Sequence, residues 1–149
     1  MAIVVGAIGC ASAGPSAVVV EIPSPVRLAE PAPAASALEP ATTLGRWVGV
    51  GRQVSGDSWE MVVDLVALGP GICGHVRYPT IPCAADWICS EGSGRRALRA
   101  REHVIEGQDA CIDGGEMTMT LTRDGHLTWT WTGSGETAHA VLSRAETPR

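Results

Sequence analysis

Four of the five cysteines lie close enough in the sequence to cross-link one small domain. These are Cys73, Cys83, Cys89 and Cys111, while Cys10 stands apart near the start of the chain. An even set of cysteines inside a domain of about a hundred residues is typical of disulfide chemistry in an oxidising compartment. We therefore predict two disulfides, with a reduced cytosolic protein that keeps four buried thiols as the alternative.

Glu102 is the acidic residue best placed to act inside this domain. It shares one strand face with Leu98 and Val104, so the alternation of side chains along a strand points it inward. One interpretation is a buried structural acid, paired with an arginine or hydrogen-bonded to a tyrosine or tryptophan. The others are a general acid, and a polar group at the base of a ligand cavity that Trp129 and Trp131 help to line.

No other arrangement of reactive side chains predicts catalysis or metal binding. The chain lacks a Gly-x-Ser-x-Gly nucleophile motif, and Cys73, His75, Cys83 and Cys89 do not have the spacing of a usual zinc site. The net charge is −5, with 11 arginines and no lysine, which does not favour nucleic-acid binding. We therefore predict no catalytic residue, no metal, no cofactor and no nucleic-acid partner.

Residues 1–10 resemble the end of a bacterial lipoprotein signal. The segment is almost wholly apolar, and Ala7–Cys10 occupies the place of the lipobox, in which leucine is more usual than Ala7. The resemblance implies export and a lipid attached to Cys10. Residues 11–43 then carry six prolines among alanine, serine and valine, a composition that predicts a disordered tether.

From residue 44 onward, short stretches of alternating apolar and polar residues predict strands that are separated by glycine turns. In 117–121 and 127–131 the odd positions are apolar, and a three-residue loop ending at Gly125 keeps both sets on one face. That loop pairs Leu121 with Leu127, Met119 with Trp129 and Met117 with Trp131. The residue pattern therefore predicts the register of this hairpin as well as its strands.

The requirement that apolar residues stay on one face also predicts the register of the neighbouring hairpins. The next turn predicts the pairs Trp131–Ala138, Trp129–Ala140 and Leu127–Leu142. Large rings would then face small methyl groups, which fills an interior without overpacking it. A loop at 55–57 places Trp47 across from Leu65, and the following turn places Leu65 across from Gly74.

Cross-strand geometry also favours one pairing of the four clustered cysteines. If Tyr78 faces Ala84 across a turn, then Cys73 faces Cys89 and Trp87 lies on the outer face. The predicted disulfides are then Cys73–Cys89 and Cys83–Cys111.

These elements predict an all-β domain over residues 44–145, built as an antiparallel meander of about seven or eight strands. Successive hairpins that curl in one direction can close into a small barrel, and closure would remove exposed strand edges. A two-sheet sandwich made of the same strands is the alternative fold.

The two ends of this domain resemble the calycins, the family of small secreted barrels that includes lipocalins and avidins. Gly45–Trp47 opens the first strand, and Arg144 follows the apolar set of the last one. The resemblance implies that Arg144 covers Trp47 as a cation–π cap. The spacing from Tyr78 to Cys111 also resembles small extracytoplasmic domains of bacterial secreted proteins, whose function is unassigned.

We therefore expect an extracytoplasmic, non-enzymatic binding module that contacts the membrane through a lipid on Cys10. Its expected partner is a small apolar ligand or a protein. A secreted inhibitor of a hydrolase, which uses a loop or the tether as a plug, is the alternative. A cavity lined by Glu102, Trp129 and Trp131 would favour the small ligand, whereas a filled interior with a rigid protruding loop would favour inhibition.

Overall fold

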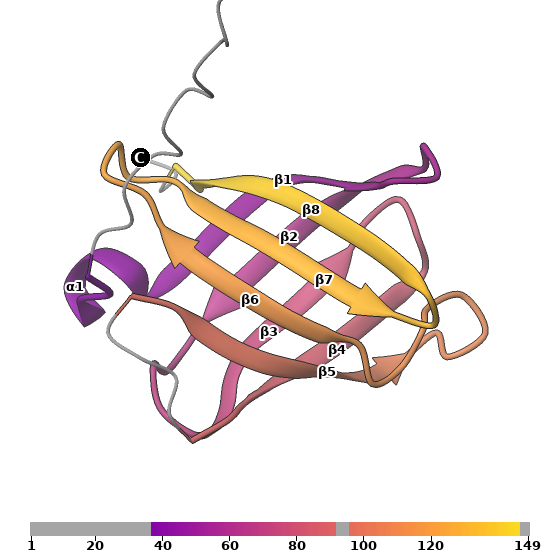
Figure 1. Cartoon of the computed structure of the whole chain (residues 1–149), viewed down its shortest axis with the longest axis horizontal. Coiled ribbons are helices and arrows are strands. Elements are labelled where there is room, and N and C mark those ends of the chain that lie inside the picture. The colour runs from indigo at the N-terminus through magenta and orange to yellow at the C-terminus, as the bar shows by residue number, and fades with distance from the viewer. Residues whose placement is uncertain (1–36, 92–95, 147–149) are drawn as a thin grey trace, which may run out of the picture. The chain divides into compact units, whose positions relative to one another are not determined.

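Alternating residues build eight strands in the computed structural model, which describes residues 37–91 and 96–146 (Figure 1). The elements are α1 (Pro40–Thr43), β1 (Gly45–Gln53), β2 (Ser58–Leu65), β3 (Gly71–Tyr78), β4 (Cys83–Cys89), β5 (Leu98–Glu106), β6 (Glu116–Leu121), β7 (Leu127–Gly133) and β8 (Glu136–Arg144). Cys10 and the tether up to residue 36 lie outside the described residues. In the described part of the chain, no helix is long and apolar enough to cross a bilayer.

Every strand pairs antiparallel with its sequence neighbours, and β1 also pairs with β8, so the sheet closes into a barrel. The pair Trp47–Arg144 lies on this closing seam. The predicted all-β meander and its closed form are therefore confirmed, and the two-sheet sandwich is wrong. Closure leaves the sheet without an unpaired edge strand.

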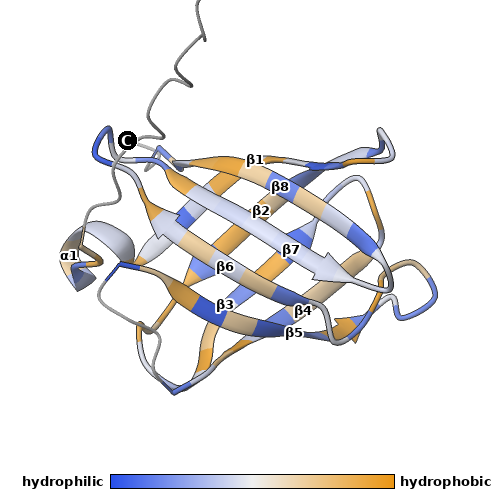
Figure 2. Cartoon of the chain, viewed as in Figure 1, coloured by the Kyte–Doolittle hydropathy of each residue, from blue (hydrophilic) through white to orange (hydrophobic). Residues whose placement is uncertain are grey.

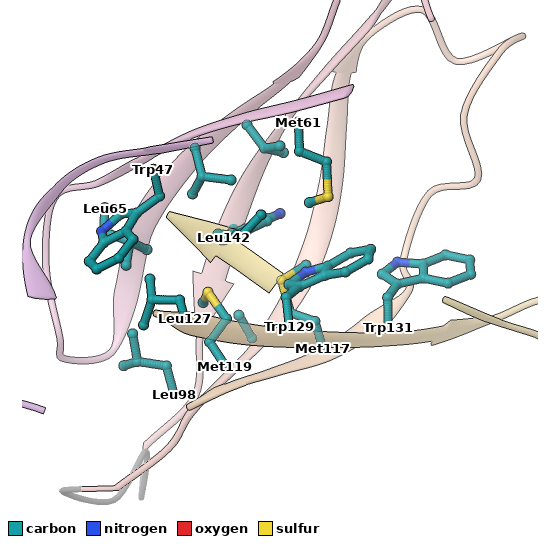
Figure 3. Close-up of a cluster of buried hydrophobic side chains, with 14 of the residues drawn as sticks. Trp47, Met61, Leu65, Leu98, Met117, Met119, Leu127, Trp129, Trp131 and Leu142 are labelled. Carbon is teal, nitrogen blue, oxygen red and sulfur yellow. The ribbon is translucent and has the colours of Figure 1, made fainter. Parts of the chain in front are cut away.

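The core lies inside the barrel because alternate residues of each strand point inward. Hydrophobic and hydrophilic bands accordingly alternate along the strands in Figure 2. The largest fully buried side chains include Trp47, Trp87 and Trp129. Figure 3 shows Trp47 at one end of the buried cluster and Trp131 at the other, with Leu127 and Trp129 between them.

The predicted register is confirmed at three hairpins and wrong at two, β1–β2 and β3–β4. Leu121–Leu127, Trp129–Ala140 and Leu65–Gly74 are paired as predicted. Trp47, however, lies opposite Val63 rather than Leu65. The reason is the loop: Gln53 N–H bonds to the carbonyl of Asp57, so the loop is residues 54–56 and Gly56 takes its last position with φ of 111°. The shift is two residues, so the inward face is preserved.

The turn between β3 and β4 overturns the prediction that Trp87 faces outward. Tyr78 pairs with Cys83 instead of Ala84, so the turn is one residue shorter than predicted and Gly74 pairs with Trp87. The side chain of Trp87 therefore lies inside the barrel, at 0% exposed. Beyond this pair Ile72 pairs with Ile88, so Cys73 is an extra residue, a β-bulge, in the ladder.

Two disulfides join the same cysteine pairs that the sequence favoured. Cys73–Cys89 links β3 to β4, with the Cα atoms 5.7 Å apart. Cys83–Cys111 links the start of β4 to the segment between β5 and β6, with a Cα separation of 6.2 Å. Two disulfides in a domain of this size indicate an oxidising, extracytoplasmic environment.

The helix α1 closes one end of the barrel over Trp47. The indole Nε1 of Trp47 donates to the carbonyl of Thr43 at 2.8 Å, and the guanidinium carbon of Arg144 lies 4.7 Å from the centre of the indole ring. Arg144 also donates to the carbonyls of Thr42 and Leu44. The expected cation–π cap is therefore present. Because Leu38 and Thr43 are buried, the packed structure begins within the segment that the sequence assigned to the tether.

Candidate functional site

A cavity of about 130 Å³ lies at the opposite end of the barrel from α1. Strand ends and two connecting segments build it, since β1, β3, β5 and β7 all finish at this end. Its walls are largely aromatic and aliphatic: Gln53, Trp59, Tyr78, Ile81, Glu102, Ala110, Cys111, Ile112, Trp129 and Trp131. A concave apolar site with a few polar groups is the usual form of a small-molecule site.

Three glycines leave the space in which the rim tryptophans lie. A Cβ atom on Gly115 would fall 2.0 Å from Nε1 of Trp131, and one on Gly133 would fall 2.7 Å from Cη2 of the same ring. A Cβ atom on Gly51 would fall 2.6 Å from Cε2 of Trp59. The rings therefore pack directly against the backbone of these glycines. A side chain at any of the three glycines would clash with the ring that lies there.

Glu102 lies at the base of the cavity, with 5% of its surface exposed. Its Oε1 accepts hydrogen bonds from the hydroxyl of Tyr78 and, at 3.4 Å, from the indole N–H of Trp87. Its Oε2 accepts no hydrogen bond from the described residues, and no described arginine or histidine forms an ion pair with it. One oxygen of a buried acid is therefore left available at the base of the cavity.

Burial sets the ionisation of this acid. It raises the pKa of the Glu102 carboxyl above its ordinary value of 4.5, and hydrogen bonding by Tyr78 and Trp87, together with the nearby indole of Trp131, offsets only part of that rise. Burial, followed by the negative charge of Glu102, raises the pKa of Tyr78 well above its ordinary value. Tyr78 therefore keeps its proton and acts as a donor to Glu102.

Two of the tryptophans that line the cavity have an indole N–H without a hydrogen-bond partner. Nε1 of Trp129 and Nε1 of Trp131 are both buried and unpaired. Trp131 lies near enough to Glu102 to lower the pKa of that acid, but its N–H does not meet hydrogen-bond geometry. A buried donor without a partner costs about 1–3 kcal/mol, so a molecule that accepts from these groups would be stabilised in the cavity.

The second disulfide fixes the rim of the cavity. Cys111 belongs to the segment between β5 and β6 and is held to Cys83. In that segment Asp113 Oδ1 accepts from the backbone N–H of Val104 at 2.8 Å, and Gly114 N–H donates to the carbonyl of Glu102 at 2.9 Å. Loop, disulfide and β5 therefore hold one wall of the cavity in place.

The structure brings Glu102, Trp129 and Trp131 together in one cavity, as the sequence proposed for a ligand site. Two further contributors escaped sequence reasoning. Trp87 was assigned to the outer face, because the turn between β3 and β4 was predicted one residue too long. Gly115 was not singled out in the sequence, whereas it makes room for Trp131.

Family models, curated proteins and solved structures gave no match to this chain. The closed eight-stranded antiparallel barrel is consistent with a calycin-like architecture. Among residues 37–91 and 96–146, no three histidine, cysteine, aspartate or glutamate side chains gather as a metal site would require. The function therefore has to be inferred from the cavity itself.

The raised pKa of Glu102 predicts a specific dependence of stability on pH. The folded protein holds a proton on this acid more tightly than the unfolded chain, so the stabilisation is complete below pH 4.5 and is lost as the pH rises through the raised pKa. The variant Glu102→Gln does not ionise. Its stability relative to the natural protein should therefore increase above pH 4.5, by about 1.4 kcal/mol for each unit by which folding raises the pKa.

The measurement is the free energy of unfolding in urea for both proteins between about pH 4 and about pH 8. Asp64 and Asp124, whose pKa values are lowered in the folded protein and which do not act on Glu102, are present in both proteins, so their contributions cancel in the difference. A difference in stability that does not change with pH would show that Glu102 ionises normally.

Proposed function

We propose that this domain is an extracytoplasmic, non-enzymatic binding module of the calycin type that holds a small, mostly apolar ligand. The observation that carries the proposal is that residues lining an aromatic cavity have polar groups without hydrogen-bond partners. Oε2 of Glu102 accepts no hydrogen bond from the described residues, and the indole N–H groups of Trp129 and Trp131 are unpaired. A protein interior normally satisfies its buried polar groups, so unpaired ones at a cavity favour a bound partner.

The ionisable groups at the cavity support binding rather than catalysis. Of its lining residues, only Glu102 and Tyr78 can titrate, because Cys111 is held in a disulfide. Tyr78 donates to Glu102 and keeps its proton. A hydrolytic or transfer mechanism needs a nucleophile and a base within reach of each other, and these side chains do not supply that pair.

The volume of the cavity limits the part of the ligand that enters it. A cavity of about 150 Å³ in another protein takes up benzene, so 130 Å³ is suited to one six-membered ring. A larger ligand would have to leave the rest of its structure outside the barrel. This cavity favours a small ligand over the alternative of a hydrolase inhibitor, which would act through a protruding loop on a filled barrel.

The proposed location follows from the disulfides together with the N-terminal segment. Oxidised cysteine pairs favour a domain that works outside the cytoplasm. A lipid on Cys10 and a tether after it would hold the domain at a membrane surface. Mass spectrometry of the non-reduced protein from the membrane fraction would detect this lipid. A Cys10 without a lipid would contradict the proposed membrane anchor.

Titration with toluene, observed at the five indole N–H signals by nitrogen–proton NMR, tests the binding site. Toluene should shift the signals of Trp59, Trp129 and Trp131, because these side chains line the cavity. The signal of Trp47 should stay in place, because it lies at the closed end and its N–H is already bonded to Thr43. Shifts spread evenly over all the indoles, or none at all, would contradict binding in this cavity.

A further inference from the structure

The cavity offers both an acceptor and donors that lack a partner. The acceptor is Oε2 of Glu102, since Oε1 already receives Tyr78 and Trp87. The donors are the indole N–H groups of Trp129 and Trp131. A ligand that satisfies both must donate a hydrogen bond and accept one. A hydroxyl group is the smallest chemical group that does so.

We propose that the ligand of this cavity is a small ring compound that carries a neutral hydroxyl group, such as a phenol. This inference rests on the proposed function and specifies the polar group that meets Glu102. The hydroxyl donates to Glu102 and accepts from an indole N–H, while its ring contacts the aromatic walls. The same group fits a protonated Glu102, because a hydroxyl oxygen also accepts.

An anionic ligand suits the cavity poorly. No arginine, lysine or histidine is among its lining residues. The nearest charges are negative, because Glu102 lies at the base and Asp113 is close enough to raise the pKa of that acid. A carboxylate ligand would satisfy the two indole donors but would meet the carboxyl of Glu102 as a like charge, which disfavours it in a buried site.

A cationic ligand satisfies the charge of Glu102 but leaves the other polar groups unpaired. An ammonium group is a donor only, so Trp129 and Trp131 would keep their buried N–H groups without a partner. Attraction between a cation and aromatic rings would favour such a ligand. The balance between this attraction and the unpaired donors is the point that the experiment has to decide.

The experiment compares four small probes of similar size by calorimetry and by indole NMR. Phenol carries the hydroxyl, toluene replaces it with methyl, N-methylpyridinium adds a permanent positive charge, and benzoate adds a negative one. Phenol should bind about tenfold more tightly than toluene, because it alone pairs the buried groups. N-methylpyridinium and benzoate should both bind more weakly than phenol.

Variants that remove single polar atoms connect this preference to the named groups. Trp129→Phe and Trp131→Phe remove an indole N–H and keep an aromatic ring, and Glu102→Gln replaces the acid with an amide of the same shape. At least one of the two tryptophan variants, and Glu102→Gln, should reduce the phenol-to-toluene affinity ratio several-fold. The matched control is Trp47→Phe at the closed end, which should leave the ratio unchanged. Near-ultraviolet circular dichroism checks that each variant is folded.

The outcomes separate this inference from the proposed function. If toluene binds as tightly as phenol, or N-methylpyridinium binds more tightly, the hydroxyl preference is wrong while the cavity remains a binding site. If phenol is preferred but the ratio is unchanged in Glu102→Gln and in both tryptophan variants, the hydroxyl is recognised elsewhere and the inference fails. If none of the four probes binds, the proposed function fails together with it.

Discussion

Replacing both Cys83 and Cys111 with alanine is expected to lower the free energy of unfolding by about 3.5 kcal/mol. The disulfide joins residues 28 apart in the sequence, so its loss restores the conformational freedom of a long loop to the unfolded chain. It also frees a wall of the cavity, since Cys111 is one of the lining residues. Urea unfolding and a phenol titration measure the two effects.

The matched comparison is the double variant Cys73→Ala, Cys89→Ala. It opens a loop of 16 residues and should cost about 3 kcal/mol by the same reasoning. Cys73 and Cys89 are not among the cavity residues, so phenol affinity should survive this change in the folded protein. If both double variants lose phenol binding equally, the loss reflects general destabilisation, and the assignment of the second disulfide to the cavity wall is wrong.

The variant Gly115→Ala is expected to displace Trp131 and to reduce phenol affinity by more than about tenfold. The added methyl group would lie 2.0 Å from Nε1 and 2.1 Å from Cε2 of that ring, and the ring is 6% exposed, so it has little room to move. Overpacking of this kind should also cost about 1–3 kcal/mol of stability. Calorimetry and thermal unfolding measure these losses.

Gly69→Ala is the matched control, because a Cβ at Gly69 meets nothing within 4 Å. It should change neither stability nor affinity appreciably. A second check uses Trp131→Leu as the background, in which Gly115→Ala should become much less destabilising because the ring that it strikes is gone. Equal destabilisation with and without the tryptophan would place the clash elsewhere.

Most of the fold could be predicted from local pattern because strand alternation and turn chemistry act over a few residues. Leu121 and Leu127 pair on either side of a loop that has Gly125 at its last position. The position of this glycine determines the register of the hairpin. The β1–β2 register was missed by two residues because Gly56, like Gly125, takes the last position of its loop. Applying the same rule to both loops would have predicted both registers.

The inward position of Trp87 was missed because the turn between β3 and β4 spans residues 79–82, one residue fewer than predicted. Tyr78 therefore pairs with Cys83, and Trp87 pairs with Gly74 inside the barrel. A Cβ atom at Gly74 would lie 3.2 Å from the ring of Trp87, which is a close contact. The length of this turn therefore places the second donor to Glu102, and the bulge at Cys73, which has no sign in the local pattern, lies beyond that pair.

The candidate site could be predicted in part. The parity of Glu102, Trp129 and Trp131 placed all three inside the barrel. The sequence did not show which end of the barrel stays open, because that depends on α1 packing over Trp47 at one end and on the Cys83–Cys111 link at the other. Both features join segments that are distant in sequence, and alternation within a strand carries no information about them.

The position of α1 also determines at which end of the barrel an attachment through the N-terminal segment would act. The described chain enters through Leu38 and Thr43, at the end opposite the cavity, and Arg144 secures that entry by bonding to the carbonyls of Thr42 and Leu44. An anchor placed before residue 37, as proposed, would therefore join the domain at its closed end and leave the cavity end unattached.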